Sequence, residues 1–164
     1  MGIRQPLSEM IVYSQNSDIL NSIRVFEKDL LDEVNVKKVV YSDNIDHYFD
    51  FTVKLNLKVL GKKLGNKVQK LKTLLSSNNS NALYLELVKN KSVTISVDGE
   101  SIELFGEDLL IEKTLKSGYA IQEDKEVSVI LNLTLTQDLI EEGWIRDLTR
   151  KIQANRKELD LKIQ

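Results

Sequence analysis

The pair Asp98-Gly99 separates two short runs in which apolar side chains alternate with polar ones. An Asp-Gly pair in this setting is typical of a two-residue hairpin turn, because both residues adopt a positive φ there at low cost. The register set by such a turn places Ile95 opposite Ile102 and Val93 opposite Leu104. We therefore expect an antiparallel hairpin, and with it an antiparallel sheet.

Period-two alternation recurs along the chain. Residues 49–59 alternate apolar side chains with polar and cationic ones, which predicts a strand with one buried face. Residues 36–41 are β-branched and apolar enough for another strand. Shorter apolar runs at 109–115 and 119–122 and a longer alternating run at 127–133 complete the set. These runs indicate a mostly antiparallel sheet.

Helical spacing marks three longer segments. Ser17 precedes apolar residues at i, i+4, i+7 and i+11, including Ile19 and Phe26, so we expect a helix over 18–33 that ends in a left-handed turn at Asn35. Gly61 is expected to break the strand before it and to lead into a second helix, whose stripe is Leu64, Val68, Leu71 and Leu75. Residues 82–88 predict a short helix after the polar loop at 76–81.

A capping box of Thr134 and Gln137 opens the third long helix. Its inner face is expected to carry Trp144, Ile145, Leu148, Ile152 and Leu159. Gly143 inside this helix costs about 1 kcal/mol relative to alanine, which suggests that another element packs closely against the backbone there. The predicted fold class is α+β, a mostly antiparallel sheet with three main helices packed against it.

A length of 164 residues favours one compact domain over 1–164. No helix-stop signal precedes Gln164, so we expect the chain to be excised from a longer protein. No apolar run approaches the roughly 20 residues that span a bilayer, which excludes a membrane protein, and residues 1–6 lack the features of a secretory signal. A cytoplasmic location is expected.

Residue types needed for catalysis are scarce. The chain has no cysteine, which excludes disulfides and thiolate metal sites, and its one histidine leaves little from which to build a zinc site or a Ser-His-Asp triad. His47 lies beside Asp46 and near Asp50, where a general base could be proposed, but a lone histidine at a strand start is more often incidental. We expect no catalytic residue, no metal site and no cofactor in this chain.

Charge is segregated along the sequence although the formal net charge is only -2. Residues 51–85, the acid-free segment, contain seven lysines and no aspartate or glutamate, so the remainder carries −9. Lysines and helix-opening glycines can bind phosphates, whereas a solvated lysine-rich face with glycine turns is the plain alternative. The candidate anion-binding residues of this segment are Lys54, Lys58, Gly61, Lys62, Lys63, Gly65, Lys67 and Lys70.

Two further candidates, Arg146 and Arg150, fall on the face of the last helix opposite Leu148. A cationic outer face could bind phosphate or merely solubilise the helix. Tyr48, Phe49 and Phe51 lie beside the acid-free segment, where an exposed ring could stack on a base, although alternation buries some of them.

Three segments resemble isoleucyl-tRNA synthetases. Residues 142–157 are similar to the Glu-Gly, Arg, Arg, Ile-Gln, Arg-Lys pattern of the C-terminal region of that family. Arg4-Gln5-Pro6-Leu7 resembles the segment that opens this region, and residues 58–65 resemble its Lys-x-Leu-Gly-x-x-Leu-Gly element. The three occur in the family's order over about 150 residues, pointing to the cysteine-free appended domain of the eukaryote-like and type-two bacterial enzymes.

The resemblance implies an accessory α+β domain that follows the anticodon-binding helical bundle and helps to bind the anticodon region of isoleucine tRNA. The family's His-x-Gly-His and Lys-Met-Ser-Lys-Ser nucleotide-binding signatures have no counterpart here, so ATP and magnesium would act in the parent enzyme outside this chain. The implied partners are tRNA and the rest of the synthetase, with no DNA and no membrane. The alternative is a module that docks on the synthetase bundle or another protein without contacting RNA.

Overall fold

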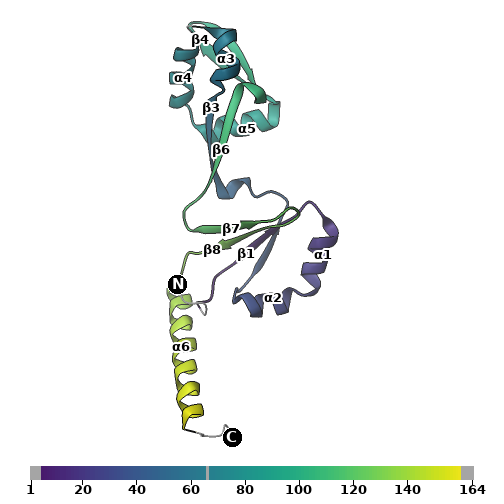
Figure 1. Ribbon diagram of the computed structural model, residues 1–164, viewed down its shortest axis with the longest axis vertical. Helices are drawn as coiled ribbons and strands as arrows, with labels where there is room; N and C mark the ends of the chain where they lie inside the picture. The colour runs from purple at the N-terminus through teal and green to yellow at the C-terminus, as the bar shows by residue number, and fades with distance from the viewer. Residues whose placement is uncertain (1–4, 66, 160–164) are drawn as a thin grey trace. The chain divides into compact units, whose positions relative to one another are not determined.

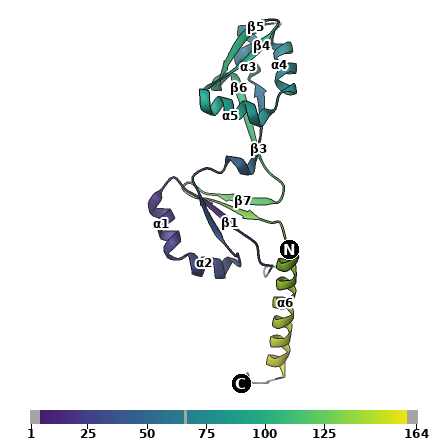
Figure 2. The same ribbon diagram turned by 180° about the vertical axis from the view of Figure 1, so that it is seen from behind.

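The computed structural model describes residues 5–65 and 67–159 of the chain. Its contacts divide the chain into two compact units (Figures 1 and 2). Unit 1 comprises Met1–Asp46 and Ser117–Gln164, and unit 2 comprises His47–Lys116. Each unit is described by itself below, and the single domain expected over the whole chain stays a prediction.

Unit 1 is built on a four-stranded sheet with the order β2-β1-β8-β7. The strands are β1 (Met10–Tyr13), β2 (Val39–Ser42), β7 (Tyr119–Glu123) and β8 (Ser128–Asn132). β1 pairs in parallel with β2 and antiparallel with β8, which in turn pairs antiparallel with β7. The centre of this sheet is fully buried, since Ile11 and Ile130 face each other across β1 and β8 with no exposed surface.

Two helices of unit 1, α1 (Ser17–Val25) and α2 (Glu27–Val34), replace the single helix expected over 18–33. Phe26 leaves the helical conformation, with φ −104° and ψ 17°, and its side chain is 63% exposed. The break lets residues from both helices, including Ile23 and Leu30, pack against one cluster of sheet side chains. Asn35 ends α2 in the left-handed conformation, which confirms that prediction.

Unit 2 contains a two-stranded sheet of β3 (Phe49–Leu55) and β6 (Leu109–Leu115), a hairpin of β4 (Ser92–Val97) and β5 (Glu100–Phe105), and three helices. The helices are α3 (Leu57–Leu64), α4 (Lys67–Ser77) and α5 (Ser80–Asn90). One-turn 3₁₀ helices, η1 (Asp46–Tyr48) and η2 (Gly106–Asp108), precede β3 and β6. Leu71, Val93 and Leu104 lie at the centre of the core, each at most 1% exposed.

The β4–β5 hairpin confirms the predicted register. Ile95 lies opposite Ile102 and Val93 opposite Leu104. Asp98 and Gly99 form the turn with φ of 54° and 84°, the left-handed values for which an Asp-Gly pair is suited.

The strand expected over 49–59 is shorter in the structure. β3 ends at Leu55, and Asn56 accepts hydrogen bonds from the backbone N–H groups of Val59 and Leu60 as α3 begins. Leu60 is 2% exposed and Leu57 is 52% exposed, so from residue 57 the burial follows a helical period and not the alternating one. Gly61 therefore lies inside a helix and does not break a strand.

The last helix, α6 (Gln137–Glu158), begins two residues later than the capping box at Thr134 implied. Thr136 is its N-cap and accepts a hydrogen bond from the Leu139 N–H. The prediction of close packing at Gly143 is confirmed, because a Cβ built there would lie 2.6 Å from the Gln5 side-chain oxygen.

The predicted inner face of α6 is exposed. We call these residues the α6 stripe, and their exposed fractions run from 49% to 70%: Trp144, Ile145, Leu148, Ile152 and Leu159. Trp144 is 65% exposed, so its expected place in the core is wrong. Only the first turns of α6 are buried, at Leu139 and Gly143. The fold class nevertheless agrees with the α+β prediction. Among the strands of the described residues, four of the five pairings are antiparallel and β1–β2 is parallel.

Candidate nucleic-acid interface

The ten candidate residues fall in both units. Eight lie in unit 2 on or beside β3, α3 and α4: Lys54, Lys58, Gly61, Lys62, Lys63, Gly65, Lys67 and Lys70. Arg146 and Arg150 lie on α6 of unit 1. The structure therefore groups the lysines of the acid-free segment within one unit, and the two arginines are considered separately.

The two candidate glycines differ in their surroundings. Gly65 follows α3 with φ +50°, a backbone conformation that L side chains rarely adopt. It lies two residues before the start of α4 at Lys67. Gly61 lies within α3, where a Cβ would meet nothing within 4 Å. Only Gly65 therefore has the position near a helix start that the phosphate-binding hypothesis requires.

Carboxylates from other strands reach the lysines of the acid-free segment. Lys54 Nζ lies 2.6 Å from Glu112 of β6. On α4, Lys70 Nζ lies 2.7 Å from Asp98, and Lys67 pairs with Glu100. The segment is free of acids in sequence but not in space, because the β4–β5 turn and β6 bring carboxylates beside it.

Lys63 has the most buried partner. Its Nζ lies 3.1 Å from Oδ1 of Asp108 in η2, and the Asp108 side chain is only 4% exposed. The other oxygen of Asp108 accepts a hydrogen bond from the Phe105 N–H at 3.1 Å. The hydrogen bond to Asp108 raises the pKa of Lys63. This lysine therefore fastens α3 to η2, which makes it less available to an external phosphate than its neighbours.

Other lysines of the segment remain open to solvent. Lys58 of α3 and Lys72 of α4 are exposed and have no ion pair within the described residues. Unit 2 contains eleven lysines and eight acidic residues, a formal charge of +3, which leaves −5 for unit 1 in the chain total of -2. Cationic charge is thus concentrated in the unit that carries the acid-free segment.

The aromatic side chains beside the segment are buried. Phe49 and Phe51 are 6% and 8% exposed, and Tyr48 is 9% exposed. The Phe51 ring stacks on Tyr84 with centroids 3.6 Å apart, and the Lys113 ammonium lies over the Phe49 ring. Alternation on β3 places the Phe49 and Phe51 rings in the core, and Tyr48 is buried in η1. The hypothesis that one of these rings stacks on a base is therefore wrong for this arrangement.

The two arginines of α6 have different roles in the structure. Arg146 donates from Nε and Nη2 to one oxygen of Glu142, at 3.1 and 2.8 Å, and from Nη1 to Asn35. Lys37 donates to the same Glu142 oxygen at 2.7 Å, and this hydrogen bond lowers the pKa of Glu142. Arg146 therefore helps to fasten α6 to the α2–β2 connection.

Arg150 lies one turn further along α6 and lines a surface groove of about 970 Å³ between α6 and the end of α2. Gln153 and Lys157 line the same groove from α6, while Asp32 and Glu33 line it from α2. The opposing carboxylates make the groove mixed in charge, which is a weaker anion site than the outer face of α6 alone implied.

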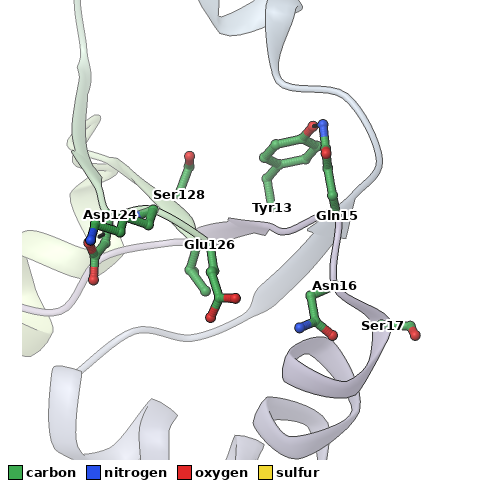
Figure 3. A pocket seen from close by; sticks show the side chains of 9 residues that line it. Tyr13, Gln15, Asn16, Ser17, Asp124, Glu126 and Ser128 are labelled. Carbon is green, nitrogen blue, oxygen red and sulfur yellow. Dashed lines mark hydrogen bonds between the residues drawn. The ribbon is translucent and has the colours of Figure 1, made fainter.

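A second hollow of unit 1, of about 620 Å³, lies where β1 meets α1 (Figure 3). Its lining is polar: Tyr13, Gln15, Asn16, Ser17, Asp124, Lys125, Glu126, Val127 and Ser128. Gln15 donates a hydrogen bond to the Tyr13 hydroxyl, and the Asn16 side chain caps α1 by accepting from the Asp18 N–H. None of the ten candidate residues lines this hollow.

Within residues 5–65 and 67–159, no three side chains of histidine, aspartate or glutamate are grouped as a metal site would require. In the same part of the chain, no helix combines the length and the apolar character needed to cross a bilayer. Of the segments on which the resemblance rested, Arg4 lies outside the described residues.

Sequence reasoning missed the acidic partners of the lysines. For Glu112, a prediction that strand 49–55 pairs with strand 109–115 would have supplied the signal. That antiparallel register places Glu112 diagonally across from Lys54. The proximity of Asp98 and Glu100 to α4 had no such signal, since it depends on how the hairpin packs against the helix.

Comparisons with known proteins agree with the resemblance. No protein-family model matches the chain. The chain is 32% identical over 163 residues to an isoleucine–tRNA ligase of Treponema denticola, covering 99% of this chain and 15% of the relative. It is 35% identical over 158 residues to that of Treponema pallidum and 37% identical over 158 residues to that of Clostridium novyi.

The chain spans only about 15% of the length of these relatives, whereas 94–99% of its own residues are matched. The matched stretch therefore includes both units and the motifs quoted above. The resemblance to isoleucyl-tRNA synthetases is thereby confirmed, and the chain is the counterpart of one segment of the isoleucine–tRNA ligases.

Proposed function

We propose that this chain is a non-catalytic part of an isoleucine–tRNA ligase that helps to bind the anticodon region of isoleucine tRNA. The observation that carries the proposal is the concentration of lysines on α3 and α4 within a unit of net positive charge. Lysines on a helical surface contact the phosphate backbone and fix the position of the RNA, but they do not select bases.

The exposed lysines without ion pairs, Lys58 and Lys72, are the first contacts expected in this proposal. Lys67 and Lys70 continue the surface along α4. ATP, magnesium and the amino acid would bind elsewhere in the ligase, which acts in the cytoplasm in this proposal.

Titration of the 164-residue chain with isoleucine tRNA at several salt concentrations tests the proposal. Phosphate contacts predict a linear fall of log affinity with log salt concentration, with a slope of about 0.7 to 0.9 for each phosphate neutralised. Lys58→Glu is expected to weaken binding and to reduce this slope by about one contact. Lys89→Glu, an exposed lysine on α5 of the same unit, is the matched control.

Affinity that does not depend on salt, or equal losses from Lys58→Glu and Lys89→Glu, would show that the lysine surface of α3 and α4 does not bind RNA. Circular dichroism of each variant establishes that a loss of affinity does not come from unfolding.

A second candidate function is favoured by the α6 stripe. Ile145, Leu148, Ile152 and Leu159 are spaced by three, four and seven residues, so they lie along one face of the helix, and all are about half exposed or more. Contiguous apolar side chains of this kind mark protein interfaces. In this alternative the chain docks on the rest of an isoleucine–tRNA ligase through α6.

Trp144, which belongs to the α6 stripe, reports on such docking. Its exposed indole is expected to shift its fluorescence to shorter wavelength when the chain is mixed with a ligase that lacks the matching segment. The double substitution Leu148→Ser and Ile152→Ser should abolish the shift without altering the fold, because both side chains are exposed. An unchanged emission spectrum on mixing would contradict docking through this face.

A further inference from the structure

Two lysines of α4 are paired with carboxylates from the neighbouring hairpin. Lys70 Nζ lies 2.7 Å from Asp98, the first residue of the β4–β5 turn, and Lys67 is hydrogen-bonded to Glu100, the first residue of β5. The helix and the hairpin thus face each other through two adjacent ion pairs, spaced by three residues on α4 and two on the hairpin.

Both pairs are open to water. The side chains of Lys67 and Glu100 are 43% and 67% exposed, and those of Lys70 and Asp98 are 62% and 57% exposed. Exposed ion pairs contribute only about 0.2 to 1 kcal/mol, so an external anion can replace the carboxylate at a small cost. A phosphate group offers the same lysine an oxygen acceptor of equal or greater charge.

Asp108 shows what a carboxylate with a structural role looks like in this unit. Its side chain is nearly fully buried and also accepts a bond from the backbone N–H of Phe105. Asp98 and Glu100 have no such second bond among the hydrogen bonds of the described residues. Their carboxylates therefore contribute little to the fold and mainly neutralise the two lysines.

We propose that Asp98 and Glu100 are built-in competitors of RNA phosphate for Lys67 and Lys70. The inference rests on the proposed RNA-binding function and adds a control of affinity to it. Binding would exchange two lysine–carboxylate pairs for two lysine–phosphate pairs. This exchange favours a polyanion that presents several phosphates together over a single anion, because only several contacts made at once compensate for both exchanges.

The exchange has a measurable consequence for salt dependence. A lysine already neutralised by a carboxylate gains less from binding a phosphate, and the released carboxylate recruits cations from solution. Both effects reduce affinity and the net release of ions. Removing the two carboxylates is therefore expected to tighten RNA binding by roughly twofold to twentyfold and to steepen the salt slope by up to about 1.5.

The variant Asp98→Asn with Glu100→Gln tests the proposal in the 164-residue chain, with isoleucine tRNA as the probe. Asparagine retains the turn, since it adopts the positive φ of residue 98 at least as readily as aspartate. Glu103→Gln is the matched control on the same hairpin, because Glu103 accepts a hydrogen bond from Ser92 and has no lysine partner in the described part of the chain.

A second pair of variants separates a local effect from a general change of charge. The same two substitutions are made in a chain that carries Lys67→Gln and Lys70→Gln. If the carboxylates act on these two lysines, removing them changes affinity much less in this background than in the wild-type background.

The expected result is tighter and more salt-dependent binding for the double carboxylate variant alone. If wild-type chain binds tRNA but the variant matches Glu103→Gln, the competition is refuted while the RNA-binding proposal stands. An equal gain in the Lys67→Gln and Lys70→Gln background also refutes it, since the effect is then only one of net charge. If neither wild-type chain nor variant binds tRNA, both proposals are wrong.

Discussion

Gly143 and Gly61 both lie inside helices, but the structure predicts opposite responses when each is changed to alanine. A Cβ on Gly61 of α3 would meet nothing within 4 Å. A Cβ on Gly143 of α6 would lie 2.6 Å from Oε1 and 3.1 Å from Cδ of Gln5. The Gln5 amide donates a 2.6 Å hydrogen bond to the Leu139 carbonyl, so the glutamine cannot move aside without weakening that bond.

The two effects have similar magnitudes. Alanine in place of glycine in a helix interior stabilises by about 0.5 to 1 kcal/mol when nothing obstructs it. Loss of the hydrogen bond from Gln5 costs about 0.5 to 1.5 kcal/mol. Gly61→Ala is therefore expected to stabilise unit 2 by up to about 1 kcal/mol, whereas Gly143→Ala leaves unit 1 unchanged or destabilises it by up to about 1 kcal/mol.

Amide hydrogen exchange in α3 and α6 measures each response in its own unit, which is necessary because the two units need not unfold together. A double-mutant cycle sharpens the test. In a Gln5→Ala background the obstruction is gone, so Gly143→Ala should regain the stabilisation of about 0.5 to 1 kcal/mol. The reasoning is refuted if Gly143→Ala stabilises α6 in the wild-type background as much as Gly61→Ala stabilises α3.

Two further perturbations test the core and the ion pairs. Leu71→Ala, at a side chain with no exposed surface, should lower the free energy of unfolding of unit 2 by about 2 to 5 kcal/mol in denaturant titrations, and Leu74→Ala, 37% exposed in the same helix, by much less. The hydrogen bond from Lys37 lowers the pKa of Glu142. The ionised Glu142 carboxylate therefore contributes to stability above the ordinary glutamate pKa, and this contribution is lost as the pH falls through the lowered pKa. Glu142→Gln should remove this part of the pH dependence of unfolding and Glu141→Gln should not.

The sequence by itself determined the elements whose signals are local. The turn at Asp98-Gly99 and its two cross-strand pairs follow from backbone conformation and loop length, which neighbouring residues decide. The left-handed end of α2 at Asn35 and the crowded Gly143 were predictable for the same reason. The family could also be inferred, because motifs in order along the chain need no structure to be recognised.

The boundaries of the helices and strands depended on which side chains are buried in a core. The apolar run at 49–59 alternates throughout, and only the burial of Leu60 reveals that a helix has begun by residue 57. Phe26 matched the helical stripe of 18–33 but is exposed, because the sheet of unit 1 is covered by two shorter helices. The α6 stripe has the period of a buried face, yet a period states only which residues share a face and not whether anything covers it.

The prediction from sequence and the structure differed most in the electrostatic surroundings of the lysines of the acid-free segment. The acid-free segment predicted an isolated cationic surface, whereas tertiary packing brings Asp98, Glu100 and Glu112 to within bonding distance of its lysines. Electrostatic interaction depends on distance in space, and residues about 30 apart in the chain become neighbours when a hairpin packs on a helix. The sequence therefore determined which lysines are candidates for binding RNA, and only the tertiary structure decided which of them already have a partner.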